Sequence, residues 1–296
     1  ESRGLGDVYK RQITDIASLY NNIQAAIAGA ERIFQIMDEP SEAPDVPKAV
    51  RMASARGDIC MKDVCFSYEP GKPVLKHVSM HVRPGERIGL VGATGAGKTT
   101  ILNMLPRFYD IASGEITIDG VRIECIARDD LRRLLAIVLQ DTHLFTGTVA
   151  DNIRFGNLDA TDDDIVRAAK LTSAHSFIKR LPHGYDTMLE NDGENLSQGQ
   201  RQLLNIARAA VANPSVLLLD EATSNIDTRS EMLIQRGLDK LMEGRTSFVI
   251  AHRLSTVRTL DRILVLENGE IIEEGNHAEL MARKGYYYRL YCNQFE

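Results

Sequence analysis

The segment GATGAGKTT, at residues 92–100, constrains the fold more than any other part of this sequence. It fits the phosphate-loop pattern G-x-x-x-x-G-K-[ST], with Gly92, Gly97, Lys98 and Thr99 at the fixed positions. A short apolar run at 87–91 precedes it and suits a buried strand, and residues with helical spacing follow it. The order strand, glycine loop, helix therefore predicts a nucleotide-binding site.

Each residue type in this loop has a physical reason. Glycines let the backbone curl so that successive N–H groups point inward, and the start of the helix adds partial positive charge. Lys98 can reach the outer phosphates, and the Thr99 hydroxyl can hold Mg²⁺. The residues expected to bind the nucleotide here are Gly92, Thr94, Gly95, Gly97, Lys98, Thr99 and Thr100.

The bulk composition excludes some function classes. The 296 residues carry 35 Lys and Arg against 41 Asp and Glu, a net charge of -6. This charge balance does not indicate a basic surface that would bind nucleic acid, so no nucleic-acid partner is expected. The 4 cysteines form no C-x-x-C pair, which indicates reduced structural thiols and no zinc site.

The first part of the chain reads as three segments. Residues 1–12 open with Glu rather than Met and resemble a non-native leader such as translated adapter sequence, so they are set aside. Residues 13–38 have apolar positions at threes and fours, which predicts a long amphipathic helix. Three prolines make 39–56 an extended linker, and a compact domain is expected from 57 to 296.

The rest of the chain indicates an α/β fold. Alternating runs between 58 and 91 predict antiparallel strands, and a hairpin is expected to close at Asp119–Gly120. Residues 160–212 have mostly helical spacing, and a helical subdomain is expected at about 145–215. From Val216 onward, apolar strands alternate with helices, which predicts a parallel core sheet covered on both faces. No run of eighteen apolar residues occurs, so nothing here is expected to span a membrane by itself.

Two further motifs bear on chemistry. In V-L-L-L-D-E, Asp220 stands at the end of an apolar strand, where it suits a Mg²⁺ shell, and Glu221 beside it could polarise an attacking water. In N-L-S-Q-G-Q-R-Q, Ser197 and Gln200 form a capping box that should begin a helix. A helix start with a serine hydroxyl and the bare amide of Gly199 could clamp a phosphate, but any capped helix has this appearance. The expected buried face of that helix comprises Leu203, Leu204, Ile206, Ala207, Ala210 and Val211.

Taken together, the motifs resemble those of the ATP-binding cassette (ABC) ATPases. Six occur in the family's order between about Asp58 and the end of the chain: the phosphate loop, V-L-Q-D, the signature L-S-Q-G-Q, V-L-L-L-D-E, S-N-I-D and I-A-H-R. The signature departs from the commoner L-S-G-G-Q by having Gln198 at its third place. The resemblance implies a phosphate-loop ABC ATPase fold with an antiparallel β-subdomain and a helical signature subdomain.

The resemblance also implies roles for single residues. Tyr68, in F-S-Y-E-P, would stack on adenine, Gln140 would complete the Mg²⁺ shell with Thr99 and Asp220, and Glu221 would be the general base. The remaining residues so implicated are His252 at the γ-phosphate, Ser224 and Asp227 in S-N-I-D, and Ser197, Gln198, Gly199 and Gln200 acting on the nucleotide of a partner. Two ATP molecules would then join two such domains head to tail, as a homodimer or a heterodimer.

Residues 13–38 resemble the cytoplasmic end of the last transmembrane helix of an ABC exporter. A membrane domain upstream on the same polypeptide is therefore expected, with this domain at the cytoplasmic face of the membrane. Two other readings remain open: an importer cassette encoded apart from its membrane subunits, and a soluble ABC ATPase acting on nucleic acid. The transported substrate cannot be predicted.

Overall fold

The computed structural model describes residues 2–42, 44–139, 142–221, 226–251 and 257–293. It divides into two units, 1–44 and 45–296. Its α-helices are α1 (Ser2–Met37), α2 (Lys98–Met104), α3 (Arg128–Leu134), α4 (Val149–Arg154), α5 (Asp162–Leu171), α6 (His175–Ile178), α7 (Gln198–Val211), α8 (Thr228–Met242), α10 (His277–Arg283) and α11 (Tyr286–Asn293). Its strands are β1 (Ile59–Phe66), β2 (Leu75–Val82), β3 (Arg87–Gly92), β4 (Ser113–Ile118), β5 (Val121–Arg122), β6 (Leu135–Val138), β7 (Gly147–Thr148), β8 (Met188–Leu189), β9 (Val216–Glu221), β10 (Thr246–Ala251), β11 (Arg262–Glu267) and β12 (Glu270–Gly275).

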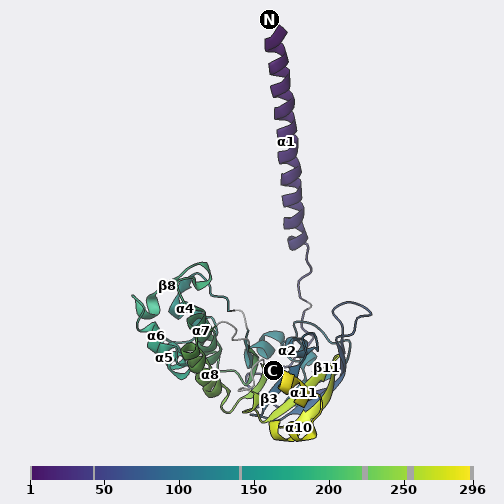
Figure 1. Ribbon diagram of the computed structural model, residues 1–296, viewed down its shortest axis with the longest axis vertical. Helices are drawn as coiled ribbons and strands as arrows, with labels where there is room; N and C mark the ends of the chain where they lie inside the picture. The colour runs from purple at the N-terminus through teal and green to yellow at the C-terminus, as the bar shows by residue number, and fades with distance from the viewer. Residues whose placement is uncertain (1, 43, 140–141, 222–225, 252–256, 294–296) are drawn as a thin grey trace. The chain divides into compact units, whose positions relative to one another are not determined.

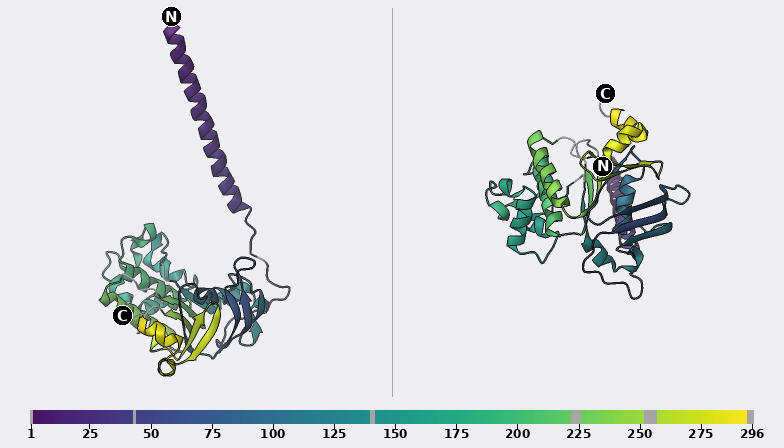
Figure 2. Two further views of the ribbon diagram at one scale, coloured as in Figure 1. Left: turned by 45° about the vertical axis from the view of Figure 1, so that its right-hand side comes forward. Right: turned by 90° about the horizontal axis from the view of Figure 1, so that it is seen from below.

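The first unit is one continuous helix, α1, followed by the start of the linker (Figure 2). The helix begins at Ser2 and therefore includes residues 2–12. Val8 and Tyr9 extend the three-and-four spacing that continues at Ile13, and no proline interrupts the chain before Pro40, which explains the longer helix. Among the described residues, no helix is long and apolar enough to cross a membrane.

The compact unit begins earlier than Gly57, the residue that the sequence favoured. Val50 forms a parallel bridge with Ile126, and the Met52 N–H donates to Asp130 Oδ2 at 3.1 Å. The proline-rich segment has a turn at residues 47–48, where the Ala49 N–H donates to the Val46 carbonyl at 3.0 Å, and its backbone groups find partners on α3 and on the residues just before it. The second half of the linker is therefore part of the folded unit from Asp45 onward.

The predicted antiparallel strands form a four-stranded sheet of order β2-β1-β4-β5. Its hairpin closes at Asp119–Gly120, where both residues have positive φ, 50° and 79°. Such a turn favours Asp-Gly because both central residues are left-handed. This sheet and its hairpin confirm the sequence prediction for this part of the chain.

The predicted parallel core is a six-stranded sheet of order β12-β11-β3-β10-β9-β6. All its neighbouring strands are parallel except the edge pair β11 and β12. Alternate residues of β9 enter different cores: Val216 and Leu218 pack with the antiparallel sheet and α2, whereas Leu217 and Leu219 pack with the helices α4 to α8. Both faces are covered, as near-continuous apolar strands require.

The helices α4 to α8 gather on one side of the sheets, and the C-terminal helices α10 and α11, in yellow, lie beside β11 (Figure 1). The predicted buried face of α7 is buried throughout. Because α7 packs against α4, α5 and α8, it holds the start of the signature helix on a fixed platform. The α/β class, the parallel core and the helical signature region are thus confirmed.

Candidate nucleotide-binding site

The phosphate loop connects β3 to α2, as the sequence predicted. A Cβ on Gly92 would lie 2.3 Å from the Leu266 carbonyl oxygen, so no larger residue fits there without a shift. Gly97 precedes α2 with φ 102°, and a Cβ on it would lie 2.8 Å from Leu75 Cδ2. The glycines therefore serve both the backbone conformation and the close packing of the loop on two sheets.

The loop also meets the turn between β11 and β12. A Cβ on Gly97 would lie 3.9 Å from Gly269 Cα, and one on Gly269 would lie 2.2 Å from the Val74 carbonyl oxygen. The Lys76 N–H donates to the Gly269 carbonyl at 2.9 Å. The six-stranded sheet, the antiparallel sheet and the phosphate loop are therefore packed backbone to backbone at this point.

The Lys98 side chain is held inside the loop. It is 9% exposed, and its ammonium donates to the carbonyls of Gly92 at 2.8 Å and of Ala93 at 2.9 Å. Burial lowers the pKa of Lys98, and the nearby Asp220 carboxylate acts in the opposite direction. An ammonium that is desolvated and oriented in this way is ready to bind an anion that enters the loop.

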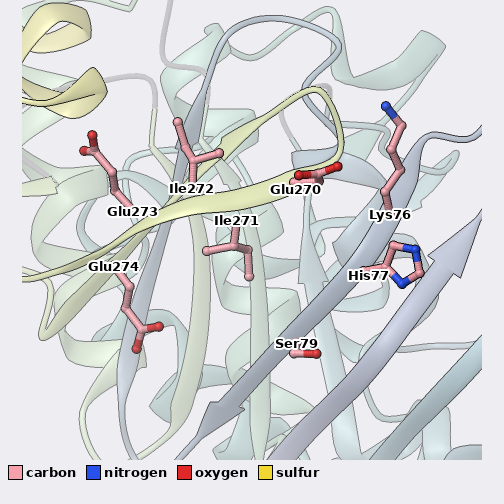
Figure 3. Close-up of a pocket in the computed structure, with 8 residues that line it drawn as sticks. All are labelled: Lys76, His77, Ser79, Glu270, Ile271, Ile272, Glu273 and Glu274. Carbon is pink, nitrogen blue, oxygen red and sulfur yellow. The ribbon is translucent and has the colours of Figure 1, made fainter.

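Of two hollows of similar volume in the described part of the chain, the one over the phosphate loop contains the motif residues. The hollow over the phosphate loop has a volume of about 460 Å³. It is lined by Tyr68, Val74, Thr94, Gly95, Gly97, Lys98, Thr99, Thr100, Asp220 and Ile250. Figure 3 shows the other hollow, about 410 Å³, between β2 and β12. Two of its carboxylates have structural partners: Glu273 accepts from the Tyr287 N–H at 3.0 Å, and Glu274 pairs with Arg262.

The structure thus brings together residues that are far apart in the sequence. The Tyr68 hydroxyl donates to Thr100 Oγ1 at 3.3 Å, and Asp220 reaches the same hollow from the end of β9. Sequence reasoning missed Val74 and Ile250, which line the hollow as ordinary apolar residues. Val74 stands directly before β2, and no local pattern distinguishes it from other strand-flanking valines.

The oxygen donors in this hollow suit Mg²⁺. Thr99 offers a hydroxyl and Asp220 a carboxylate, and Mg²⁺ in nucleotide sites is held by few protein oxygens together with phosphates. The described residues contain no cluster of three or more His, Cys, Asp or Glu side chains that could hold a metal alone. Gln140, predicted as a further ligand, lies outside the described residues.

Another predicted residue stands at the end of a strand of the core sheet. Glu221 follows Asp220 in β9 and pairs in register with Ala251 of β10, but only its backbone is described. His252 comes next after Ala251 in the sequence and lies outside the described residues, as does Ser224. Asp227 has a local role: its carboxylate accepts from the N–H groups of Arg229 at 3.1 Å and Ser230 at 3.0 Å, which begins α8.

The signature begins α7 as predicted. Ser197 Oγ accepts from the Gln200 N–H at 3.3 Å, and Gln200 Oε1 accepts from the Ser197 N–H at 2.9 Å, so the capping box is complete. Ser197 and Gln198 are exposed, whereas Gly199 is buried. A Cβ on Gly199 would lie 2.5 Å from Ser230 Cβ. The close approach of α7 and α8 therefore explains by itself why residue 199 is a glycine.

Asp192, shortly before the signature, contacts His143 and Leu144, which follow Gln140 in the sequence. One of its carboxylate oxygens accepts from the Leu144 N–H at 2.7 Å, and the other lies 3.4 Å from His143 Nδ1. These contacts hold the pKa of Asp192 below its usual value, with the Leu144 hydrogen bond as the largest cause. Thr142 adds a second contact by donating to Gln202 Oε1 at 2.8 Å. Sequence analysis assigned these residues no individual role.

Comparison with known proteins agrees with this site. The sequence model of the ABC transporter family matches residues 75–224, and the chain belongs to this family. The matched region contains the ATP-binding part of such transporters, which is an ATPase domain.

The particular relatives are transporters about twice as long. The chain is 51% identical over 288 residues to the uncharacterized ABC transporter ATP-binding protein YfiC of Bacillus subtilis, covering 97% of this chain and 48% of that protein. It is 48% identical over 282 residues to a fatty acid ABC transporter ATP-binding/permease protein of Mycobacterium bovis, covering 95% and 44%. It is 46% identical over 281 residues to the ATP-dependent lipid A-core flippase of Syntrophus aciditrophicus, covering 95% and 47%.

A solved structure supports the same fold. A bacterial Atm1-family ABC exporter with ATP bound superposes with a TM-score of 0.83 at 39% sequence identity, covering 94% of this chain and 48% of that chain. The chain therefore spans about half the length of the relatives that it matches.

Proposed function

We propose that this chain is the ATP-hydrolysing part of an ABC exporter, in which ATP-driven pairing of two such domains energises export. The observation that carries the proposal is the hollow that joins the phosphate loop to Asp220 and Tyr68. The relatives named as a permease fusion and a flippase favour export over the importer and nucleic-acid alternatives.

Within the site, each side chain has a proposed task. Lys98 holds the outer phosphates, Thr99 and Asp220 hold Mg²⁺ with Gln140, and Tyr68 stacks on adenine. Glu221 acts as the general base for the attacking water, and His252 holds the γ-phosphate side. Mg²⁺ supplies charge neutralisation on the phosphates.

The proposed partner is a second nucleotide-binding domain of this kind, a second copy or a related chain. Ser197, Gln198 and Gly199 of one domain would meet the γ-phosphate bound by the other, with Ser224 and Asp227 at the same interface. The exposure of Ser197 and Gln198 at the start of α7 supports this role. The proposed location is the cytoplasmic face of a membrane, connected through residues 13–56 to a membrane domain on the same polypeptide.

The test is the Glu221→Gln variant. It keeps the shape of the side chain but removes the basic carboxylate, so ATP should bind while hydrolysis slows by about 100-fold or more. ATP should then shift this variant from monomer to dimer, whereas ADP should not, because ADP lacks the γ-phosphate. Size-exclusion chromatography with light scattering measures the shift.

The unchanged chain is the matched control, and it should stay mostly monomeric in all three conditions of ATP, ADP and no nucleotide. A Glu221→Gln variant that hydrolyses ATP at the parent rate would contradict the assignment of the base. One that stays monomeric in saturating ATP would contradict the pairing.

A further inference from the structure

Tyr68 does not stand alone at the edge of the nucleotide hollow. Its ring centroid lies 4.8 Å from that of Phe66, with the planes at 88°, and 5.1 Å from that of Tyr109, with the planes at 90°. Phe66 and Tyr109 are themselves 5.8 Å apart. The three rings therefore form a closed cluster, and edge-to-face pairs of this kind are favourable.

The members of the cluster differ in burial. Phe66 is 4% exposed and belongs to the core under the antiparallel sheet, whereas Tyr68 and Tyr109 are each 47% exposed. A half-exposed tyrosine has several rotamers available unless its neighbours restrict it. Phe66 restricts one side of the Tyr68 ring, and Tyr109 supplies the second ring contact.

The backbone around Tyr109 is fixed by a buried arginine. Arg107 has a left-handed φ of 54° and is 8% exposed. Its guanidinium donates to Asp110 Oδ1 at 3.1 Å and to the Glu124 carbonyl at 3.4 Å, so it connects the turn that carries Tyr109 to the segment around Glu124. The Ala112 N–H donates to the Cys65 carbonyl at 2.9 Å, which joins this turn to the end of β1.

This turn directly follows α2, the helix that begins at the phosphate loop. Tyr68 therefore contacts this part of the chain twice. Its hydroxyl donates to Thr100 in α2, and its ring packs against that of Tyr109 in the turn after α2. Both contacts come from the same short segment of chain, because α2 ends at Met104. The orientation of the Tyr68 ring is thus linked to the position of the phosphate loop.

We infer that Tyr109 is a positioning residue for nucleobase recognition: it holds the Tyr68 ring in the orientation that stacks on the base of a nucleoside triphosphate. The inference rests on the proposed function, since it requires Tyr68 to contact the base. It assigns Tyr109 no contact with the phosphates. The effect of Tyr109 on binding should therefore depend on the base and on Tyr68.

The test measures binding of two Mg²⁺ complexes to the full chain by calorimetry. One is ATP, and the other is inorganic tripolyphosphate, which has the phosphates without the base. Tyr109→Ala should weaken ATP binding by about threefold to tenfold, the range expected for one lost aromatic pair, and change tripolyphosphate binding less than about twofold. Tyr109→Phe keeps the ring and should bind ATP as the parent does.

Two further variants separate positioning from general packing. Phe108→Ala is the matched control, because Phe108 is also 47% exposed but its ring lies under the Arg132 guanidinium at 5.4 Å. It should leave ATP binding unchanged. Because Tyr109 acts through Tyr68, adding Tyr109→Ala to Tyr68→Ala should weaken ATP binding no further.

The inference is overturned if Tyr109→Ala leaves ATP binding unchanged, if it weakens both probes equally, or if its effect multiplies with that of Tyr68→Ala. These results differ from a failure of the proposed function. A parent chain that does not bind ATP, or a Tyr68→Ala variant that binds it as the parent does, would instead contradict the nucleotide site or the role of Tyr68.

Discussion

At the scale of single residues, Lys98 and Ser197 illustrate two ways in which a side chain serves the site. Lys98 is buried, and its ammonium is oriented by two carbonyls of its own loop. Ser197 is exposed, and its hydroxyl already has a local partner in the Gln200 N–H. A test of either residue must therefore separate its effect on the local fold from its effect on the nucleotide.

For Lys98 the informative change is Lys98→Ala, which removes the cation expected at the outer phosphates. We expect ATP turnover to fall on the order of 100-fold, the usual consequence of removing one preorganised donor in a water-excluded site. A coupled assay of phosphate release measures this. Lys72→Ala is the control, because Lys72 is exposed and pairs with the neighbouring Glu69 at 2.7 Å. Turnover near the parent level in Lys98→Ala would contradict the phosphate-loop assignment.

Some residues were predictable from the sequence because their partners are close in the chain. The Ser197 capping box and the Asp119–Gly120 turn each depend on residues within three or four positions. Asp192 and Tyr109 were not predicted, because their partners, Leu144 and Tyr68, are 48 and 41 positions away by residue number. Long-range contacts of this kind follow from the packing of whole elements and leave no local pattern.

At the scale of elements, the close contact between α7 and α8 leaves no room for a side chain larger than that of glycine at position 199. The added Cβ in Gly199→Ala would point at Ser230 of the same chain, 2.5 Å from its Cβ, and not away from the domain. The glycine of the signature thus allows two helices to approach closely, and this reading makes a prediction different from that of a phosphate clamp.

We expect Gly199→Ala to destabilise the domain by about 1–3 kcal/mol, the cost of overpacking a close contact. Adding Ser230→Gly removes the opposing Cβ and should restore most of the stability and of the ATPase activity. Thermal unfolding and phosphate release measure the two effects, and Ser230→Gly alone is the control. A double variant that is stable but inactive would show instead that the site requires the bare Gly199 backbone.

Two features at this scale could not be predicted from the sequence: the strand order of the core sheet and the start of the compact unit. The strand order of the core sheet, β12-β11-β3-β10-β9-β6, is not sequential, and the alternation of strands and helices could indicate only that the strands are parallel. The early start of the compact unit at Asp45 depends on Asp130 and Ile126, which lie far along the chain. Proline content predicted an extended linker and did not indicate this attachment.

At the scale of the whole molecule, the proposed pairing places Ser197 against the nucleotide of a second domain. Ser197→Asp tests this, because aspartate caps a helix about as well as serine. The variant should fold and bind ATP like the parent. Its carboxylate would face the partner's γ-phosphate, so ATP-dependent dimerisation of the Glu221→Gln background should weaken by about 100-fold or more.

Ser197→Asn is the matched neutral control, since asparagine also caps the helix and has nearly the same shape as aspartate. It should dimerise much better than Ser197→Asp in sedimentation-velocity experiments with ATP. Equal dimerisation of the two variants would mean that no phosphate of a partner approaches the start of α7.

The backbone contact among Gly97, Gly269 and Val74 has a consequence for the energetics of ATP binding. Because these close contacts fix the two sheets and the phosphate loop against one another, the two ends of the hollow are held in a preorganised arrangement. Ordering them costs little conformational entropy on binding. More of the free energy of ATP binding is then available for the proposed pairing of two domains, the step that would perform work on a membrane domain.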